Sequence, residues 1–402
     1  MTDAATHTLF DVALKKVIDT VGATGAAVYL GDPDRPLLRL AAAQGSRAAD
    51  DAPWPVEKAW GKRSGGATAE PLTEVDNDGT TLSVPLLLGE DEVGTVVVST
   101  GSRVFSGVDV DDLSRQCRAL ARALAPEPLP ALRDELARRI PSAAREWLEG
   151  GIAAAARGER DAILTGFPAM GRRIGREPLG SRSALVSHDM DADVPLRAWR
   201  LDDAGRVALL CAFAGDAEAL ARELYFSGDL RERCGALRGL AVLGRTPGAI
   251  DAVRDAIRSS AMELFEAALA DNPYACRFLP DDEFRHAVLK AAFVGLSIER
   301  LPGIEARADA ELSRMLLSYV TEREVAGRSV PPDIWPVAAL HPTPGLVGKL
   351  CGYLEHPAAA HRAAAATALG RIGDRRADPF LKDRLAREDD RTVRRILERV
   401  LS

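Results

Sequence analysis

Hydrophobic and polar residues alternate with two different periods along this 402-residue chain. Apolar residues recur at helical spacing over residues 8–21 and again over about 109–124. Between these predicted helices, apolar runs bounded by Gly, Asp and Pro predict strands at residues 26–30, 37–43, 81–88 and 93–99. The last two strands form a hairpin. The pattern therefore predicts an N-terminal α/β domain over residues 1–125, an antiparallel sheet with flanking helices.

The pattern changes after a short Pro-rich segment. Pro126, Pro128 and Pro130 cannot continue a helix, so residues 126–130 are expected to form a stiff linker. Beyond them the apolar residues keep helical spacing, as in the stripe formed by Phe284, Ala287, Val288, Ala291 and Ala292. We expect no strand in this part of the chain, and we expect residues 174–196 to form a long irregular loop.

Residues 356–402 repeat a spacing found earlier in the chain. Arg362, Ala365, Leu369, Ile372 and Gly373 correspond to Arg233, Ala236, Leu240, Leu243 and Gly244. This segment resembles a HEAT-type repeat, since the separation is about three units of the usual roughly 40 to 47 residues. The sequence thus predicts an all-α HEAT-like helical solenoid, with a helical domain at 131–355 and a C-terminal repeat at 356–402. Stacked helices of this kind offer a surface for partners or a groove for ligands.

Composition limits the classes of function. A formal net charge of −7 and a pI of about 5.6 give no support to nucleic-acid binding. The five cysteines are widely scattered, which predicts reduced thiols in a cytoplasmic protein. The start of the sequence lacks a signal-peptide pattern and no apolar run is long enough to cross a bilayer, so any membrane contact would be peripheral. The abundance of Ala and Arg is typical of a GC-rich bacterial genome.

Sequence motifs for catalysis are missing. Phosphate-binding loops, nucleophile elbows, dinucleotide fingerprints and zinc motifs do not occur at their required spacings. We therefore predict no catalytic residue, no cofactor and no metal site, and we favour a binding protein over an enzyme. His356 and His361 are five residues apart, which fits metal ligands on adjacent helical turns poorly, and we expect them at the surface.

The least generic stretch is 271–335, where Pro, Asn, Tyr, Trp and charged residues interrupt the helices. Asn272 and Pro273 end one helix, because proline lacks the N–H and disfavours helical geometry in the preceding residue. The candidate ligand-binding residues are Asp271, Asn272, Tyr274, Arg277, Lys290, Glu322, Arg323 and Arg328. If the central helices pack together, these side chains could line one polar cleft, whose guanidinium groups would suit an anionic metabolite. The alternative is an internal ion-pair network.

An ordered set of short segments stands out in the same stretch. It comprises Asp271 to Tyr274, Val288 to Ala291 with Phe293 and Gly295, Arg307-Ala308, Glu311-Leu312, Met315-Leu316, Tyr319, Glu322-Arg323, Ala326 to Arg328 and Trp335. The set resembles the EboA family of bacterial metabolite-traffic proteins, and fainter similarity extends back to residue 167. Residues 321–324 read Thr-Glu-Arg-Glu where the family usually has His-Glu-Arg-Trp. The resemblance implies a helical protein encoded among genes for moving or exporting a small metabolite, with no established catalytic activity.

The N-terminal domain carries shorter motifs. Val84-Pro85-Leu86, Val93-Gly94 and Phe105, in the order helix, strands, hairpin and helix, resemble a GAF domain over residues 8–125. This resemblance implies a small-molecule sensor or a dimerisation module. The structural role is favoured, because the segment 46–79 that should cover a ligand pocket is brief and poor in apolar residues.

Three functions remain open. The first is a non-enzymatic adaptor that binds an unknown small metabolite and works with proteins of a metabolite export or biosynthesis cluster. The second is an enzyme of that pathway, with Lys290, Glu322 and Arg323 near the chemistry. The third is a scaffold whose solenoid docks a protein and whose GAF-like domain forms a homodimer. A concave pocket would favour the first two, and a filled core would favour the third.

Overall fold

A computed structural model of the chain describes residues 3–31, 37–45, 54–55, 71–76, 79–101 and 104–401. The chain divides into two compact units. The first comprises Met1–Glu135 with Pro178–Val186 and Pro195–Trp199, and the second comprises Leu136–Glu177, Ser187–Val194 and Arg200–Ser402. Within the described ranges, no helix is long and apolar enough to cross a membrane.

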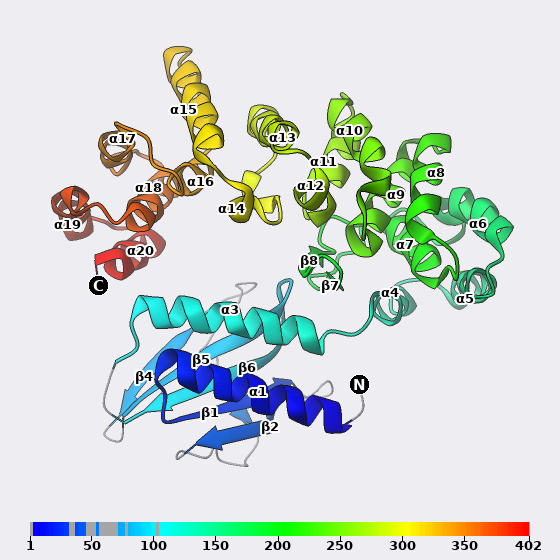
Figure 1. Cartoon of the computed structure of the whole chain (residues 1–402), viewed down its shortest axis with the longest axis horizontal. Coiled ribbons are helices and arrows are strands. Elements are labelled where there is room, and N and C mark those ends of the chain that lie inside the picture. The colour runs from blue at the N-terminus through cyan, green and yellow to red at the C-terminus, as the bar shows by residue number, and fades with distance from the viewer. Residues whose placement is uncertain are drawn as a thin grey trace. The chain divides into compact units, whose positions relative to one another are not determined.

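The first unit contains an antiparallel sheet with two helices over one face (Figure 1). Its elements are α1 (Asp3–Val21), β1 (Gly25–Gly31), β2 (Leu37–Gly45), β3 (Trp54–Pro55), β4 (Leu72–Asp76), β5 (Gly79–Leu88), β6 (Asp91–Thr100) and α3 (Gly107–Leu124). The strand order is β3-β2-β1-β6-β5-β4. Leu14 of α1 and Leu113 of α3 belong to the same buried cluster as Val28 of β1, so the apolar stripes of both helices cover the sheet. The predicted α/β architecture is confirmed. Most of the predicted variable segment 46–79 lies outside the described residues.

The second unit is rich in helices, and each packs mainly against its neighbours in the chain (Figure 1). From its N-terminal end the helices are α5 (Ser142–Ala156), α6 (Arg160–Arg173), α7 (Leu201–Ala212), α8 (Ala217–Ser227), α9 (Leu230–Leu243), η1 (Pro247–Ala249), α10 (Ile250–Arg258), α11 (Met262–Leu269) and α12 (Pro273–Phe278). They continue as α13 (Asp281–Val294), η2 (Ile298–Arg300), α14 (Ile304–Arg307), α15 (Ala310–Val325), α16 (Ile334–Ala338), α17 (Leu346–Tyr353), α18 (Ala359–Ile372), η3 (Arg375–Ala377), α19 (Asp378–Ala386) and α20 (Arg391–Leu401).

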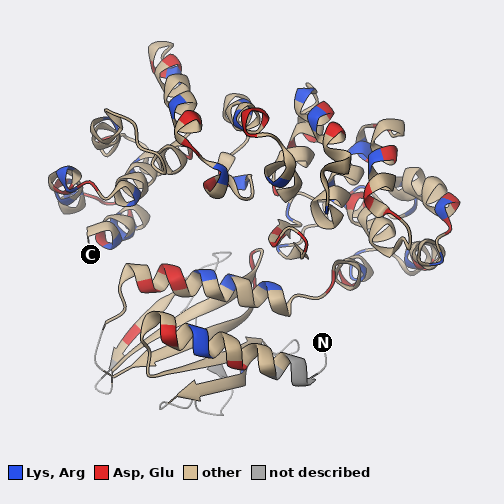
Figure 2. Ribbon diagram, in the orientation of Figure 1, with Lys and Arg blue, Asp and Glu red and all other residues tan. Residues whose placement is uncertain are grey.

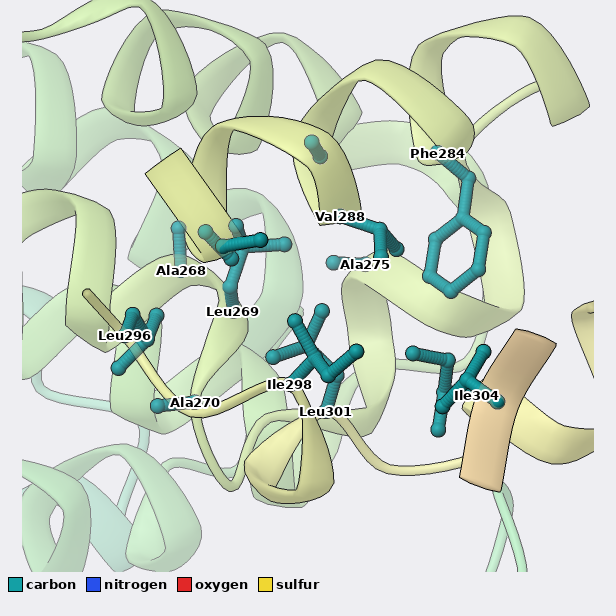
Figure 3. Close-up of a cluster of buried hydrophobic side chains, with 14 of the residues drawn as sticks. Ala268, Leu269, Ala270, Ala275, Phe284, Val288, Leu296, Ile298, Leu301 and Ile304 are labelled. Carbon is teal, nitrogen blue, oxygen red and sulfur yellow. The ribbon is translucent and has the colours of Figure 1, made fainter. Parts of the chain in front are cut away.

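One continuous apolar core runs through this unit, from Ala155 to Leu397. Figure 3 shows its central part, where Phe284 and Val288 of α13 lie near Ile298 and Ile304. All five residues of the predicted stripe on α13 are buried. Trp335 is also fully buried.

Two local predictions were wrong. Residues 174–196 contain a small two-stranded sheet, β7 (Ala184–Ser187) and β8 (Ala192–Pro195), so this part of the chain is not all-α. All four residues of β7 are buried, so this strand has no alternation of buried and exposed positions by which it could be recognised. Residues 126–130 are partly helical, because α4 (Pro128–Ala137) begins at Pro128, and proline is tolerated in the first turn of a helix.

The C-terminal repeat buries polar side chains that the sequence had suggested would be exposed. His361 is only 8% exposed, and its ring centroid lies 3.9 Å from that of His356. His361 lies on the buried face of α18 beside Arg362, whose guanidinium binds Glu388 at 2.7 and 2.8 Å. The prediction of a surface position was therefore wrong for His361.

Candidate functional site

A groove of about 470 Å³ lies between α13 and α15. On α13, one flank packs into the core while the other carries His286, Leu289, Lys290 and Phe293, which line the groove. These positions follow the spacing i, i+3, i+4 and i+7, so they share one side of the helix. Gly295, with a φ of 81°, ends α13 just beyond Phe293. A left-handed residue of this kind is a common helix stop.

The opposite wall is α15. Asp309 caps this helix by accepting a hydrogen bond from the Leu312 N–H at 2.8 Å. Leu312 and Leu316 are buried, and the neighbouring positions face the groove. The lining residues from α15 are Arg314, Met315, Ser318, Tyr319 and Glu322. The Tyr319 hydroxyl donates to the Ala292 carbonyl at 3.0 Å and so ties the two walls together.

The charged groups of the groove differ in how they are paired. Lys290 Nζ donates to the carbonyls of Ile257 at 2.5 Å and Ser259 at 3.0 Å, and it lies 4.7 Å from the centre of the Phe265 ring. The guanidinium of Arg314 binds Glu311 through two hydrogen bonds of 2.6 and 2.8 Å. The exposed carboxylate of Glu322 has no hydrogen-bond or ion-pair partner among the residues that the structure describes. Figure 2 shows acidic and basic residues interspersed along α15.

Three of the predicted site residues make structural contacts instead of lining the groove. Asn272 caps α12 by accepting from the Tyr274 N–H, and its amide donates to the carbonyls of Leu237 and Ala267. Asp271 adopts a positive φ of 56° and binds the Arg300 guanidinium at 2.7 and 3.0 Å.

Tyr274 is fully buried. Its hydroxyl oxygen lies 3.0 Å from Glu218 Oε1 and 2.7 Å from the Thr246 carbonyl, and it accepts from the Ala249 N–H. Burial raises the pKa of this phenol. Tyr274 therefore joins α12 to the start of α8 and to the turn after α9.

The predicted arginines are not among the lining residues, although Arg323 lies near one of them, Tyr319. Arg277 is exposed on α12. Arg323 donates its Nε to the Ser329 carbonyl at 2.8 Å, and its guanidinium lies 5.8 Å from the Tyr319 ring centre. Arg328 is exposed and follows Gly327, which has a φ of 64°. Of the eight candidates, the structure brings Lys290 and Glu322 together in one groove. A ligand role for any of the eight stays a prediction.

A second cavity, of about 530 Å³, lies between the end of α7 and the starts of α8 and η1. Its main charged side chains have partners within the protein. Arg222 binds Asp251, Arg245 binds Asp189, and Glu218 accepts from the N–H groups of Arg245 and Thr246. These charged groups therefore already form hydrogen bonds within the protein, and these bonds hold the helices in place.

Phe293, Met315 and Ser318 were not among the predicted site residues. Phe293 is 67% exposed, which is unusual for an aromatic side chain. A signal for Phe293 was present, since it lies off the buried stripe of α13 and within a family-like segment. Within the described ranges, no group of three or more His, Cys, Asp or Glu side chains is placed to hold a metal ion.

Comparison with protein families gives two matches. The family described as metabolite traffic protein EboA matches residues 129–339, just over half of the 402-residue chain. HEAT repeats match residues 337–402. The predicted resemblances to both are confirmed, and both walls of the groove fall within the first match.

Comparison with solved structures gives weaker similarity. The second GAF domain of DevS from Mycobacterium smegmatis is 20% identical, over 29% of this chain and 91% of that one, with a TM-score of 0.25. The GAF-B domain of DevS from the same organism is 19% identical, over 29% and 90%, with a TM-score of 0.24. At such scores the GAF-like character of the N-terminal unit stays a prediction. Curated proteins gave no match.

Proposed function

The chain belongs to the EboA family, and on that premise we propose that it is a non-enzymatic adaptor, which binds a small metabolite in the groove between α13 and α15. The groove carries this proposal. Its volume of about 470 Å³ is within the range of small-molecule sites. It is lined by both polar and apolar side chains, as such sites usually are. Lys290 and Glu322, two of the candidates from the sequence, contribute to it.

The chemistry of the chain supports binding over catalysis. Burial raises the pKa of Cys211 to about 12 and that of Cys234 to about 11, so both thiols stay protonated near neutral pH. A protonated thiol is a poor nucleophile. In the groove, Lys290 is held by two backbone carbonyls, which leaves it badly placed to act as a base.

In this proposal the C-terminal helices and the N-terminal sheet unit have roles other than binding the metabolite of the groove. Stacked helical repeats present long surfaces on which protein partners dock. In this proposal the helices from α16 to α20 receive a protein of the same metabolite pathway. The N-terminal sheet unit serves as a sensor or as a dimerisation module.

Native mass spectrometry of the protein purified from its own host tests the proposal. The parent chain is compared with Phe293→Ala, which removes an exposed wall of the groove, and with Phe226→Ala as a matched control. Phe226 is 51% exposed on α8, away from the groove. We expect a small molecule to be retained by the parent and by Phe226→Ala and to be lost from folded Phe293→Ala. Retention of the same molecule by all three proteins would contradict a ligand site in this groove.

A further inference from the structure

We propose that the ligand of the α13–α15 groove, which rests on the function proposed above, is an organic cation with an apolar, aromatic body. Sequence reasoning had favoured an anionic ligand, because arginines are frequent in this stretch. In the structure, Arg277, Arg323 and Arg328 do not line the groove, and Arg314, which does, is paired with Glu311.

The two cations that line the groove are satisfied by the protein. Two of the three N–H groups of Lys290 Nζ are used by the carbonyls of Ile257 and Ser259, and the ammonium also lies over the Phe265 ring. Contact between a cation and a ring face is favourable in itself. Arg314 forms a bidentate pair with Glu311, and such pairing neutralises its charge and uses its planar donors. An incoming carboxylate would have to displace these partners.

Glu322, the acidic residue of the groove lining, differs from these two cations in its pairing. Its carboxylate lines the groove, is exposed, and has no partner in the part of the chain that the structure describes. It lies in the last turn of α15, which ends at Val325. The carbonyl end of a helix carries partial negative charge, so a cation is favoured there and the carboxylate is not. Arg323, the next residue, donates to the Ser329 carbonyl and does not line the groove.

The apolar residues of the groove indicate that the uncharged part of the ligand is apolar and aromatic. Phe293 is 67% exposed and faces the same groove as Leu289 and Met315. The unbranched thioether side chain of Met315 can adapt to aromatic ligands of different shapes. An exposed ring beside a carboxylate also attracts an ammonium group by cation–π contact. The groove therefore combines an adaptable apolar surface with one carboxylate that has no hydrogen-bond partner among the described residues, while N–H groups of its cations are already used.

Fluorescence anisotropy with three matched probes tests this ligand class. Dansylcadaverine carries a primary amine, its N-acetyl derivative is neutral, and dansyl-6-aminohexanoic acid carries a carboxylate. We expect the amine to bind most tightly and the carboxylate most weakly. Glu322→Gln should weaken binding of the amine about three- to fivefold, in line with one solvent-exposed charge contact. Binding of the neutral probe should not change. Glu299→Gln, an exposed carboxylate on η2, serves as the control and should have no effect.

The outcomes separate this inference from the function on which it rests. Tighter binding of the carboxylate probe, sensitive to Phe293→Ala, would overturn the cationic ligand and leave the groove as a binding site. Equal weakening of all three probes by Glu322→Gln would also overturn it. Failure of every probe to bind, or binding unaffected by folded Phe293→Ala, would overturn both the ligand class and the proposed function.

Discussion

Arg254 of α10 binds Glu283 of α13 through two hydrogen bonds, Nε to Oε2 at 2.7 Å and Nη2 to Oε1 at 2.9 Å. The same kind of pair joins the helices on either side. Arg222 of α8 binds Asp251 of α10, and Arg285 of α13 binds Asp309, the cap of α15. Each arginine reaches the next of these helices in the chain. The pairs therefore link α8, α10, α13 and α15 in succession, including both walls of the groove.

The Arg254–Glu283 pair is expected to contribute little to stability. Both side chains are just over a third exposed, at 35% and 37%. Exposed ion pairs stabilise a protein by at most about 1 kcal/mol. Glu283→Gln should lower the free energy of unfolding by no more than about that amount, and the difference should shrink in high salt because of screening. Urea denaturation in low and high sodium chloride measures this. A loss above about 2 kcal/mol that salt does not change would contradict it.

A larger effect is expected at the buried pairs of α7. Asp203 is fully buried, binds Arg231 at 2.8 Å and Arg238, and accepts from the Arg200 N–H at 2.9 Å. Burial lowers the pKa of Arg238 to about 10, and the charges of Glu266 and Asp202 act against this shift. Asp203→Asn removes the fully buried carboxylate that pairs with both Arg231 and Arg238, and Arg231 keeps only Asp202, at 3.2 Å. Breaking a buried pair in this way should cost about 3 to 5 kcal/mol. The same urea experiment checks it, and a loss no larger than that of Glu283→Gln would show this account of the network to be wrong.

Tyr274 is expected to act on stability and not on ligand binding. Removing its hydroxyl in Tyr274→Phe leaves the Ala249 N–H without its acceptor, at a cost of about 1 to 3 kcal/mol. Probe binding in the groove should be unchanged, since Tyr274 does not line it. Thermal unfolding and anisotropy on the same sample separate the two effects. A stable variant that no longer binds would restore Tyr274 as a ligand residue.

Mild acid is expected to weaken the C-terminal repeat. Burial, and then the charge of nearby His356, lower the pKa of His361. The unfolded chain therefore binds a proton at His361 more readily than the folded chain does. The resulting stability is present above the ordinary histidine pKa of about 6.5 and is lost as the pH falls below that value.

The carboxylate of Glu388, which binds the neighbouring Arg362, responds in a different pH window. The ring of Tyr353 lies 5.7 Å from that of His361, and the neighbouring Arg362 holds the pKa of Glu388 at about 2. Stability from Glu388 is therefore lost only below its ordinary pKa of about 4.3. Hydrogen exchange of α18 at pH 7.5, 6.5 and 5.5 should show protection falling in the parent and changing less in His361→Asn. Equal pH dependence in both proteins would rule out His361 as the cause.

The apolar pattern was enough to predict which faces of the helices are buried. The stripe on α13 follows from the helical period of 3.6, and β1, β2, β5 and β6 follow from apolar runs bounded by turn residues, whereas β3 and β4 were not predicted. The recurrence around Arg362 likewise pointed to the C-terminal repeat that the HEAT match covers.

The polar site could not be predicted in the same way. Asp271 and Arg277 both lie beside helix ends, yet Asp271 is 7% exposed and bound to Arg300, whereas Arg277 is exposed. The difference arises because η2 packs beside Asp271, and such contact between distant segments leaves no local pattern. Asp281 and Glu283 bind Arg307 and Arg254 through contacts of the same long-range kind.

Site-specific photo-crosslinking tests the central claim most directly. Exposed Ser318, at the groove, is replaced by p-benzoylphenylalanine in the host, and Phe226 is replaced in the same way as a control. After irradiation, the account predicts an intact-mass increase of small-molecule size at position 318 and none at position 226. A protein-sized adduct at position 318, or no adduct there beyond the control, would contradict a metabolite site between α13 and α15.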